Sequence, residues 1–167
     1  MPFYLDDLDL GVEIEGVGSA LIVSCYMCPA VTVAAREGKP FIRLFSSFIR
    51  SAPFEQYMEG IQSELTRADI KTKLYRSLFL CMWPTSKRKK LADHAKDYDA
   101  IVVLACDSAA ETVRDAVSSC GCKVIQGMEV AGITNVKVSF GLPFNVSFKE
   151  AKMIPISQRK NQASAPD

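Results

Sequence analysis

The residues of this sequence whose types and spacing could carry chemistry are its cysteines. The chain has six cysteines among 167 residues, and Cys25 and Cys28 form a Cys-x-x-Cys pair. Such a pair in a tight turn lets two thiolates reach one metal ion, and two further cysteines would complete the four ligands of a zinc ion or a four-iron cluster. The sequence therefore predicts a metal or iron–sulphur site formed by Cys25, Cys28, Cys81 and Cys106.

Each part of this cysteine set follows an apolar segment. The β-branched run 19–24 predicts a buried strand that stops at Cys25, and the run 100–105 predicts another that stops at Cys106. A shorter apolar stretch, 78–80, ends at Cys81. The carboxyl ends of parallel strands meet at one edge of an α/β sheet, where ligands commonly bind, so we expect these thiols to gather there. Predicted helix starts near Cys28 and Cys106 would favour their thiolate forms.

The remaining pattern indicates the fold class. Strands predicted over 19–24, 70–75, 100–105 and 123–126 alternate with helices over 29–36, 53–68, 85–98 and from 108 onward. This order predicts an α/β fold with a parallel, Rossmann-like sheet and helices on both faces. Alternating apolar and polar residues predict a C-terminal β-hairpin at about 133–156, turning at Gly141 and Pro143, and a short edge strand containing Val12 and Ile14. We expect one domain over 1–156, with its core at 19–126, and a flexible tail at 157–167.

Composition excludes several classes of function. The net charge of +1 gives no general attraction to nucleic acid or to an acidic membrane surface. No apolar run approaches the roughly 18 residues of a membrane span, and no secretory signal pattern is present, so a cytoplasmic location is expected. Six cysteines in a reducing compartment are not expected to form disulfides. The single histidine, His94, falls on a predicted helix among charged residues, which predicts an exposed structural role.

Other interpretations of the same residues stay open at this stage. Any one cysteine could be a small buried hydrophobe, and Cys25 with Cys28 could perform thiol–disulfide exchange. Cys120 and Cys122 precede a strand, which puts them at the opposite edge in a structural role. Trp83 is either core or an aromatic cover over a cluster. The basic run 86–90 is either a solvated helix face or a docking site for an acidic partner.

The sequence also resembles a known family. The segment Asp99-Ala-Ile-Val-Val-Leu-Ala-Cys106, with Glu111-Thr-Val113 after it and Ser24-Cys-Tyr-Met-Cys28 far upstream, is similar to the small cysteine-rich subunit that accompanies methylenetetrahydrofolate reductase in acetogens. The likeness covers residues 19–126. It implies ligand roles for Cys25, Cys28, Cys81 and Cys106, and an accessory subunit that works beside heterodisulfide-reductase-type electron-transfer proteins, such as those of sulphur oxidisers.

The sequence departs from that family at three places. Thr32 stands where a third amino-terminal cysteine is expected, Asp107 replaces a glycine, and the hairpin replaces a cysteine-rich carboxyl segment. The last difference puts a second metal site in doubt.

Three hypotheses for function follow. The first is a non-catalytic accessory or electron-transfer subunit of a cytoplasmic redox complex, with a 4Fe-4S cluster or zinc, redox protein subunits as partners, and no nucleic acid or membrane. The second is a metal-free or zinc-stabilised interaction module that binds through the hairpin. The third is a thiol–disulfide enzyme that uses Cys25 and Cys28. The sequence is compatible with a homo-oligomer, and it does not separate iron from zinc.

Overall fold

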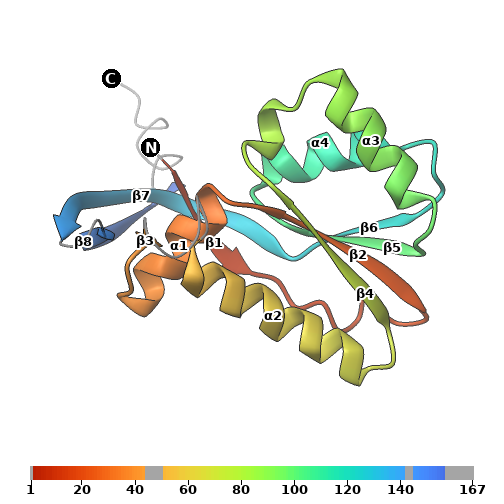
Figure 1. Cartoon of the computed structure of the whole chain (residues 1–167), viewed down its shortest axis with the longest axis horizontal. Helices are drawn as coiled ribbons and strands as arrows, with labels where there is room; N and C mark the ends of the chain where they lie inside the picture. The colour runs from red at the N-terminus through yellow and green to blue at the C-terminus, as the bar shows by residue number, and fades with distance from the viewer. Residues whose placement is uncertain (1, 44–50, 142–144, 157–167) are drawn as a thin grey trace, which may run out of the picture.

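Two four-stranded sheets, one parallel and one antiparallel, make up the computed structural model of the protein, which describes residues 2–43, 51–141 and 145–156 (Figure 1). The parallel sheet has the order β4-β2-β5-β6 and consists of β2 (Ser19–Cys25), β4 (Lys71–Ser77), β5 (Ala100–Leu104) and β6 (Lys123–Gln126). The antiparallel sheet has the order β1-β7-β8-β3 and consists of β1 (Phe3–Asp7), β7 (Met128–Gly141), β8 (Asn145–Pro155) and β3 (Ile42–Arg43).

Helices cover both faces of the parallel sheet, as the sequence predicted. Figure 1 shows α1 (Cys28–Glu37) and α2 (Ala52–Arg67) on one face, and α3 (Thr85–Ala95) and α4 (Asp107–Val117) on the other. A short 3-10 helix, η1 (Leu80–Met82), lies between β4 and α3. The α/β class and its Rossmann-like sheet are therefore confirmed. None of the helices in the described ranges is long and apolar enough to cross a lipid bilayer.

The central strands are β2 and β5, and burial explains their sequences. All five residues of β5 are fully buried, and β2 is buried from Ala20 to Cys25. Strands that are covered on both faces favour continuous apolar runs rather than alternation. The Asp99 carboxylate fixes the start of both strands, because its Oδ2 accepts hydrogen bonds from the Ser19 backbone N–H at 2.8 Å and the Ser19 hydroxyl at 2.9 Å.

The antiparallel sheet differs from the sequence prediction at its edge. Residues 11–16, expected to contain an edge strand with Val12 and Ile14, form turns instead. Gly16 has a positive φ of 76°, and the Asp9 side chain accepts a hydrogen bond from the Gly11 N–H, both of which favour turns over extended backbone. The strands that flank the hairpin are β1, antiparallel to β7, and β3, antiparallel to β8.

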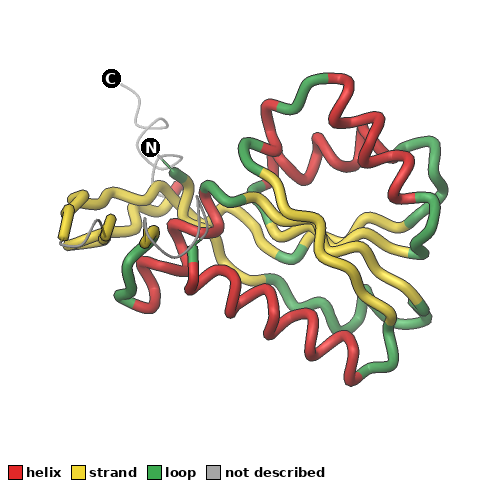
Figure 2. The backbone as a smooth tube through the Cα atoms, viewed as in Figure 1, coloured by secondary structure: helices red, strands yellow, loops and turns green. Residues whose placement is uncertain are grey.

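The predicted hairpin is confirmed, and it begins at Met128 rather than near 133. Its expected turn at Pro143 and the expected tail at 157–167 lie outside the described residues. A single residue, Gly127, separates β6 from β7, so a very short connection joins the two sheets (Figure 2). A Cβ at Gly127 would approach Leu104 Cδ2 to 2.8 Å, so any larger residue here would force the buried Leu104 side chain to shift.

Contacts between β1 and α1 hold the two sheets together. The hydroxyl of the fully buried Thr32 accepts a hydrogen bond from the Leu5 N–H at 3.2 Å and donates to the Phe3 carbonyl at 3.3 Å. Arg36, in the last turn of α1, pairs with Asp7 at 2.7 Å and also bonds the Leu5 carbonyl. Thr32 thus connects α1 to the antiparallel sheet.

We expect Thr32→Val to lower the free energy of unfolding by about 1–3 kcal/mol. The variant removes the hydroxyl that bonds to the Leu5 N–H and the Phe3 carbonyl, and an unpaired polar group inside the protein is costly. Chemical denaturation of the purified protein measures the loss. The matched control is Thr112→Val, since the Thr112 hydroxyl donates only to Ser108 O of its own helix. Equal decreases in the free energy of unfolding of the two variants would contradict the role of Thr32 in holding α1 against β1.

Candidate cysteine site at the carboxyl edge of the parallel sheet

Three of the four predicted cysteines lie where their elements begin or end. Cys25 is the last residue of β2, Cys28 is the first residue of α1, and Cys106 is the N-cap residue of α4, directly after β5. Cys25 and Cys106 are almost fully buried, with 3% and 5% of their surface exposed, whereas Cys28 is half-buried. Because α4 starts one residue earlier than predicted, the amino end of this helix falls on Cys106 itself.

Cys81 reaches this edge in a different way from the one predicted. The apolar stretch 78–80, whose placing of Cys81 needed it to be a strand, is not a strand: a bend after β4 leads into η1, which begins at Leu80, and Cys81 is exposed. The prediction fails because Phe79 adopts a left-handed conformation, with φ 49° and ψ 48°, which ends any extended run. Leu80 fills the core at 0% exposure, and η1 packs against α4.

Trp83 holds this loop in place. Its indole N–H donates to the Ser77 hydroxyl at 2.8 Å and lies 3.3 Å from the Leu78 carbonyl, and its ring meets Tyr75 edge-on at 5.9 Å. With 6% of its surface exposed, Trp83 belongs to the core. Of the two roles considered for it, the structure favours core packing.

Cys28 and Cys106 interact directly, although they come from different helices. The Cys28 thiol donates a hydrogen bond to Cys106, which lowers the pKa of Cys106 to about 6. The Ala109 N–H, in the first turn of α4, lowers it further, as expected for a thiolate at a helix amino end. The same hydrogen bond, followed by burial, raises the pKa of Cys28. The hydrogen bond therefore favours the thiolate form of Cys106 and the thiol form of Cys28.

Cys25 lies within electrostatic reach of the other thiols. Burial raises its pKa, while hydrogen bonds from the backbone N–H groups of Leu80 and Met27 oppose that rise. Negative charge on Cys106 and Cys81 raises the pKa of Cys25 further. The four predicted cysteines therefore lie along one edge of the sheet, because each follows the carboxyl end of β2, β4 or β5.

These neighbours are not arranged as a finished metal site. Within residues 2–43, 51–141 and 145–156, no group of three or more His, Cys, Asp or Glu side chains is placed to hold a metal ion. The kind of donor does fit a metal that prefers sulphur, because all four candidates are thiols and three accept hydrogen bonds from backbone N–H groups. The ligand roles of Cys25, Cys28, Cys81 and Cys106 stay a prediction.

Two supports of the site were not found by sequence reasoning. The N–H of Phe3, on the antiparallel sheet, bonds to Cys28, a contact that no local pattern signals. Tyr26, between the two cysteines of the pair, is buried; its hydroxyl bonds to Glu55, and its N–H donates to the Ser77 carbonyl at 2.9 Å. The sequence did offer a sign of the buried Tyr26, because it places a large aromatic residue between the two cysteines of the Cys-x-x-Cys pair.

Cys120 and Cys122 lie just before β6, at the amino edge of the sheet, as predicted. The Cys120 thiol donates to the Ala92 carbonyl at 3.3 Å. His94 was expected to be exposed; it is half-buried instead, because its ring packs 5.7 Å from Tyr75.

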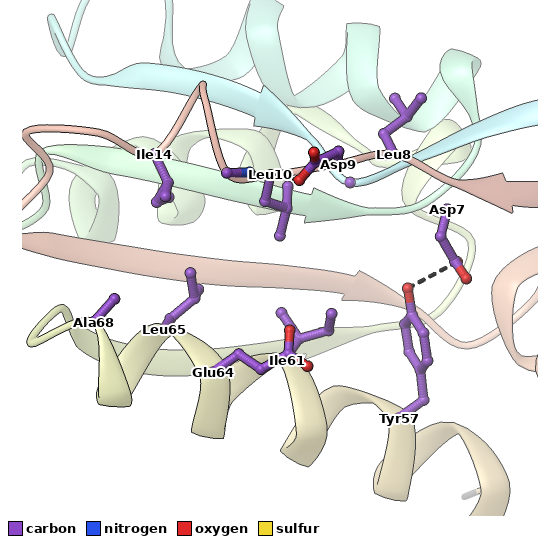
Figure 3. Close-up of a pocket in the computed structure, with 12 residues that line it drawn as sticks. Asp7, Leu8, Asp9, Leu10, Ile14, Tyr57, Ile61, Glu64, Leu65 and Ala68 are labelled. Carbon is purple, nitrogen blue, oxygen red and sulfur yellow. Dashed lines mark hydrogen bonds between the residues drawn. The ribbon is translucent and has the colours of Figure 1, made fainter.

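A cavity of about 370 Å³ lies away from the cysteines, between the segment after β1 and helix α2 (Figure 3). Leu10 and Ile61 face each other across it, and the Tyr57 hydroxyl donates to Asp7 at 2.9 Å on its rim. None of the six cysteines lines this cavity. It is therefore separate from the candidate site.

No protein-family model, no curated protein and no solved structure matches this chain. The argument about its function therefore depends on the cysteine edge itself.

In metal-free protein, we expect the Cys106 thiolate to form with a midpoint near pH 6. Cys28→Ala should move this midpoint up toward the ordinary thiol range near 8.5, because the variant removes the main hydrogen-bond donor. The thiolate absorbance in the ultraviolet, compared with that of a Cys106→Ser protein, measures the titration. Cys122→Ala is the control that should leave the midpoint unchanged, and a Cys28→Ala protein with an unchanged midpoint would refute the pairing.

Proposed function

We propose that this protein is an accessory, electron-transfer subunit of a cytoplasmic redox complex, possessing a metal or iron–sulphur centre on Cys25, Cys28, Cys81 and Cys106. The observation that supports the proposal is that these four cysteines come from three separate segments, each of which follows the carboxyl end of β2, β4 or β5 in the parallel sheet. This edge is where α/β proteins usually bind their ligands.

The surroundings of the sulphur atoms support thiolate ligands. Backbone N–H groups from Leu80, Phe3 and Ala109 each bond to a different sulphur, on Cys25, Cys28 and Cys106. Such hydrogen bonds stabilise thiolates and tune the potential of a cluster. A four-iron cluster would supply one-electron transfer, and a zinc ion would link α1, η1 and α4 without redox chemistry.

The proposal assigns the chain no catalytic step of its own. Its partners would be redox protein subunits, in agreement with the family resemblance, and heterodisulfide-reductase-like complexes of sulphur metabolism are the setting that the resemblance suggests. A reducing compartment suits the proposal, because it keeps the cysteines available as ligands.

Protein purified without oxygen should contain about four irons and matching sulphide per chain, or one zinc if the centre is structural. Cys106→Ser should lose most of this metal, because a serine hydroxyl binds iron and zinc much less strongly than a cysteine thiolate does. Cys122→Ser, at the opposite edge, is the matched control and should keep it. Elemental analysis and the visible spectrum measure both. Wild-type protein free of iron and zinc would refute the proposal.

A second candidate function is thiol–disulfide exchange, and the direct contact between Cys28 and Cys106 favours it. In this reaction the Cys106 thiolate attacks a small-molecule disulfide and expels one thiolate. Cys28 then loses its proton and attacks the Cys106 sulphur, which expels the second thiolate. The protein pair loses two electrons, and the small disulfide becomes two thiols. The reacting pair is therefore Cys28 with Cys106, rather than the Cys25 and Cys28 pair considered from the sequence. Cys28 has a hydrogen bond to Cys106, whereas Cys25 affects it only through charge.

Incubating metal-free protein with oxidised glutathione should therefore give a Cys28–Cys106 disulfide, which peptide mapping by mass spectrometry identifies. Cys28→Ser should stop at a mixed disulfide between glutathione and Cys106, while Cys120→Ser should behave as wild type. A Cys25–Cys28 disulfide as the main product would contradict this pairing.

A further inference from the structure

The exposed side of the cysteine edge carries large apolar side chains. Phe79 and Met82, on either side of Cys81, have 51% and 77% of their surfaces exposed. Cys81 is itself exposed, whereas Cys25 and Cys106 are buried. An approaching protein would therefore meet the cysteine set first at Cys81, between two apolar side chains.

The turn that presents these residues is held firmly. The Phe79 carbonyl accepts a hydrogen bond from the Met82 N–H at 2.9 Å, Leu80 is fully buried, and Trp83 is bonded to Ser77. Phe79 adopts a left-handed backbone without being glycine, which strains the chain at this point. A side chain held exposed by a strained backbone and fixed neighbours is typical of a functional surface.

A set of positive charges follows directly after this turn. Lys87, Arg88, Lys89 and Lys90 occupy the beginning of α3, which has no acidic residue in its first turn and no side-chain cap. Cations at this end oppose the helix dipole, so the placement lowers the stability of the helix. Figure 1 shows this part of α3 following η1 above α4. A charge pattern that opposes local stability suggests a role in binding.

Only one of these four cations has a structural role. Arg88 forms an ion pair with Asp115 and donates to the Trp83 carbonyl at 3.3 Å, so it fixes α3 to α4. Lys87, Lys89 and Lys90 are exposed, and within the described part of the chain their side chains form no ion pair or hydrogen bond. Lys89 also lies within electrostatic range of Asp93. A positively charged helix start that directly follows an exposed apolar turn complements a partner with an acidic surface.

We propose that a docking surface formed by Phe79, Cys81, Met82, Lys87, Lys89 and Lys90 binds an acidic redox protein over Cys81. This inference rests on the proposed function, which makes the partner a redox protein. It adds the surface through which that partner binds. The apolar side chains would form the dry centre of the contact, and the lysines its charged rim. A second copy of this chain fits poorly, because two lysine sets would repel each other.

The test uses a small acidic ferredoxin as the probe, with binding to the full chain measured by calorimetry at low ionic strength. The triple variant Lys87→Glu, Lys89→Glu, Lys90→Glu should bind at least about tenfold more weakly, because three attractions become repulsions. Met82→Ser should weaken binding by a smaller factor. Phe79→Asn, which tolerates the left-handed backbone, should do the same. Carbodiimide cross-linking should join ferredoxin carboxylates to Lys87, Lys89 or Lys90.

The matched control is Lys71→Glu with Lys73→Glu, two exposed lysines near the amino end of β4, which should leave binding unchanged. Equal binding by the triple variant and the control, or no binding of the ferredoxin to wild type, would overturn the inference. Stronger, competing binding of single-stranded DNA at the same lysines would overturn it too. Metal content is measured on the same samples, so that a metal-free protein whose binding still depends on the three lysines upholds the surface while refuting the metal centre.

Discussion

The whole arrangement depends on the position of β2 at the centre of the parallel sheet. This strand pairs with β4 on one side and β5 on the other, and it is buried from Ala20 onward. Its register is therefore fixed by two sets of backbone hydrogen bonds and by a dry environment. The Tyr26 N–H extends the pairing with β4 by bonding Ser77 O, so the turn into α1 has little freedom. The fixed register of β2 therefore determines where Cys25 and Cys28 lie, and β5 determines where Cys106 lies.

The antiparallel sheet, which contains no cysteine, completes this edge. Thr32 and Arg36 fix β1 against α1, and the Phe3 N–H is thereby brought to Cys28. Gly127 lets β6 continue into β7 where any side chain would meet Leu104. The hairpin is thus more than an appendage to a Rossmann-like core, because it positions the strand that supplies one of the backbone N–H donors to the thiols.

The parts that sequence reasoning predicted are those with a local cause. A continuous apolar run has few alternatives to a buried strand, so β2 and β5 could be found, and Cys25 and Cys106 with them. The place of Cys81 could not, because it depends on a left-handed Phe79 that no local pattern signals. Val12 and Ile14 alternated like a strand, yet the glycines around them make turns, and β1 needed its distant partner β7 to be recognised. The contact between Cys28 and Cys106 joins two helix starts that are far apart in sequence.

The two candidate functions make opposite use of one hydrogen bond. As the structure stands, the Cys28 thiol stabilises the Cys106 thiolate, which is the state a nucleophile needs. A metal ion would require Cys28 and Cys25 to lose their protons, so binding would release protons and become stronger as the pH rises. Metal binding would therefore have to break the hydrogen bond between Cys28 and Cys106. Cys81 distinguishes the two candidate functions, since it would be dispensable for exchange between Cys28 and Cys106 but would be needed as the fourth ligand of a metal centre, and it is the exposed member of the four.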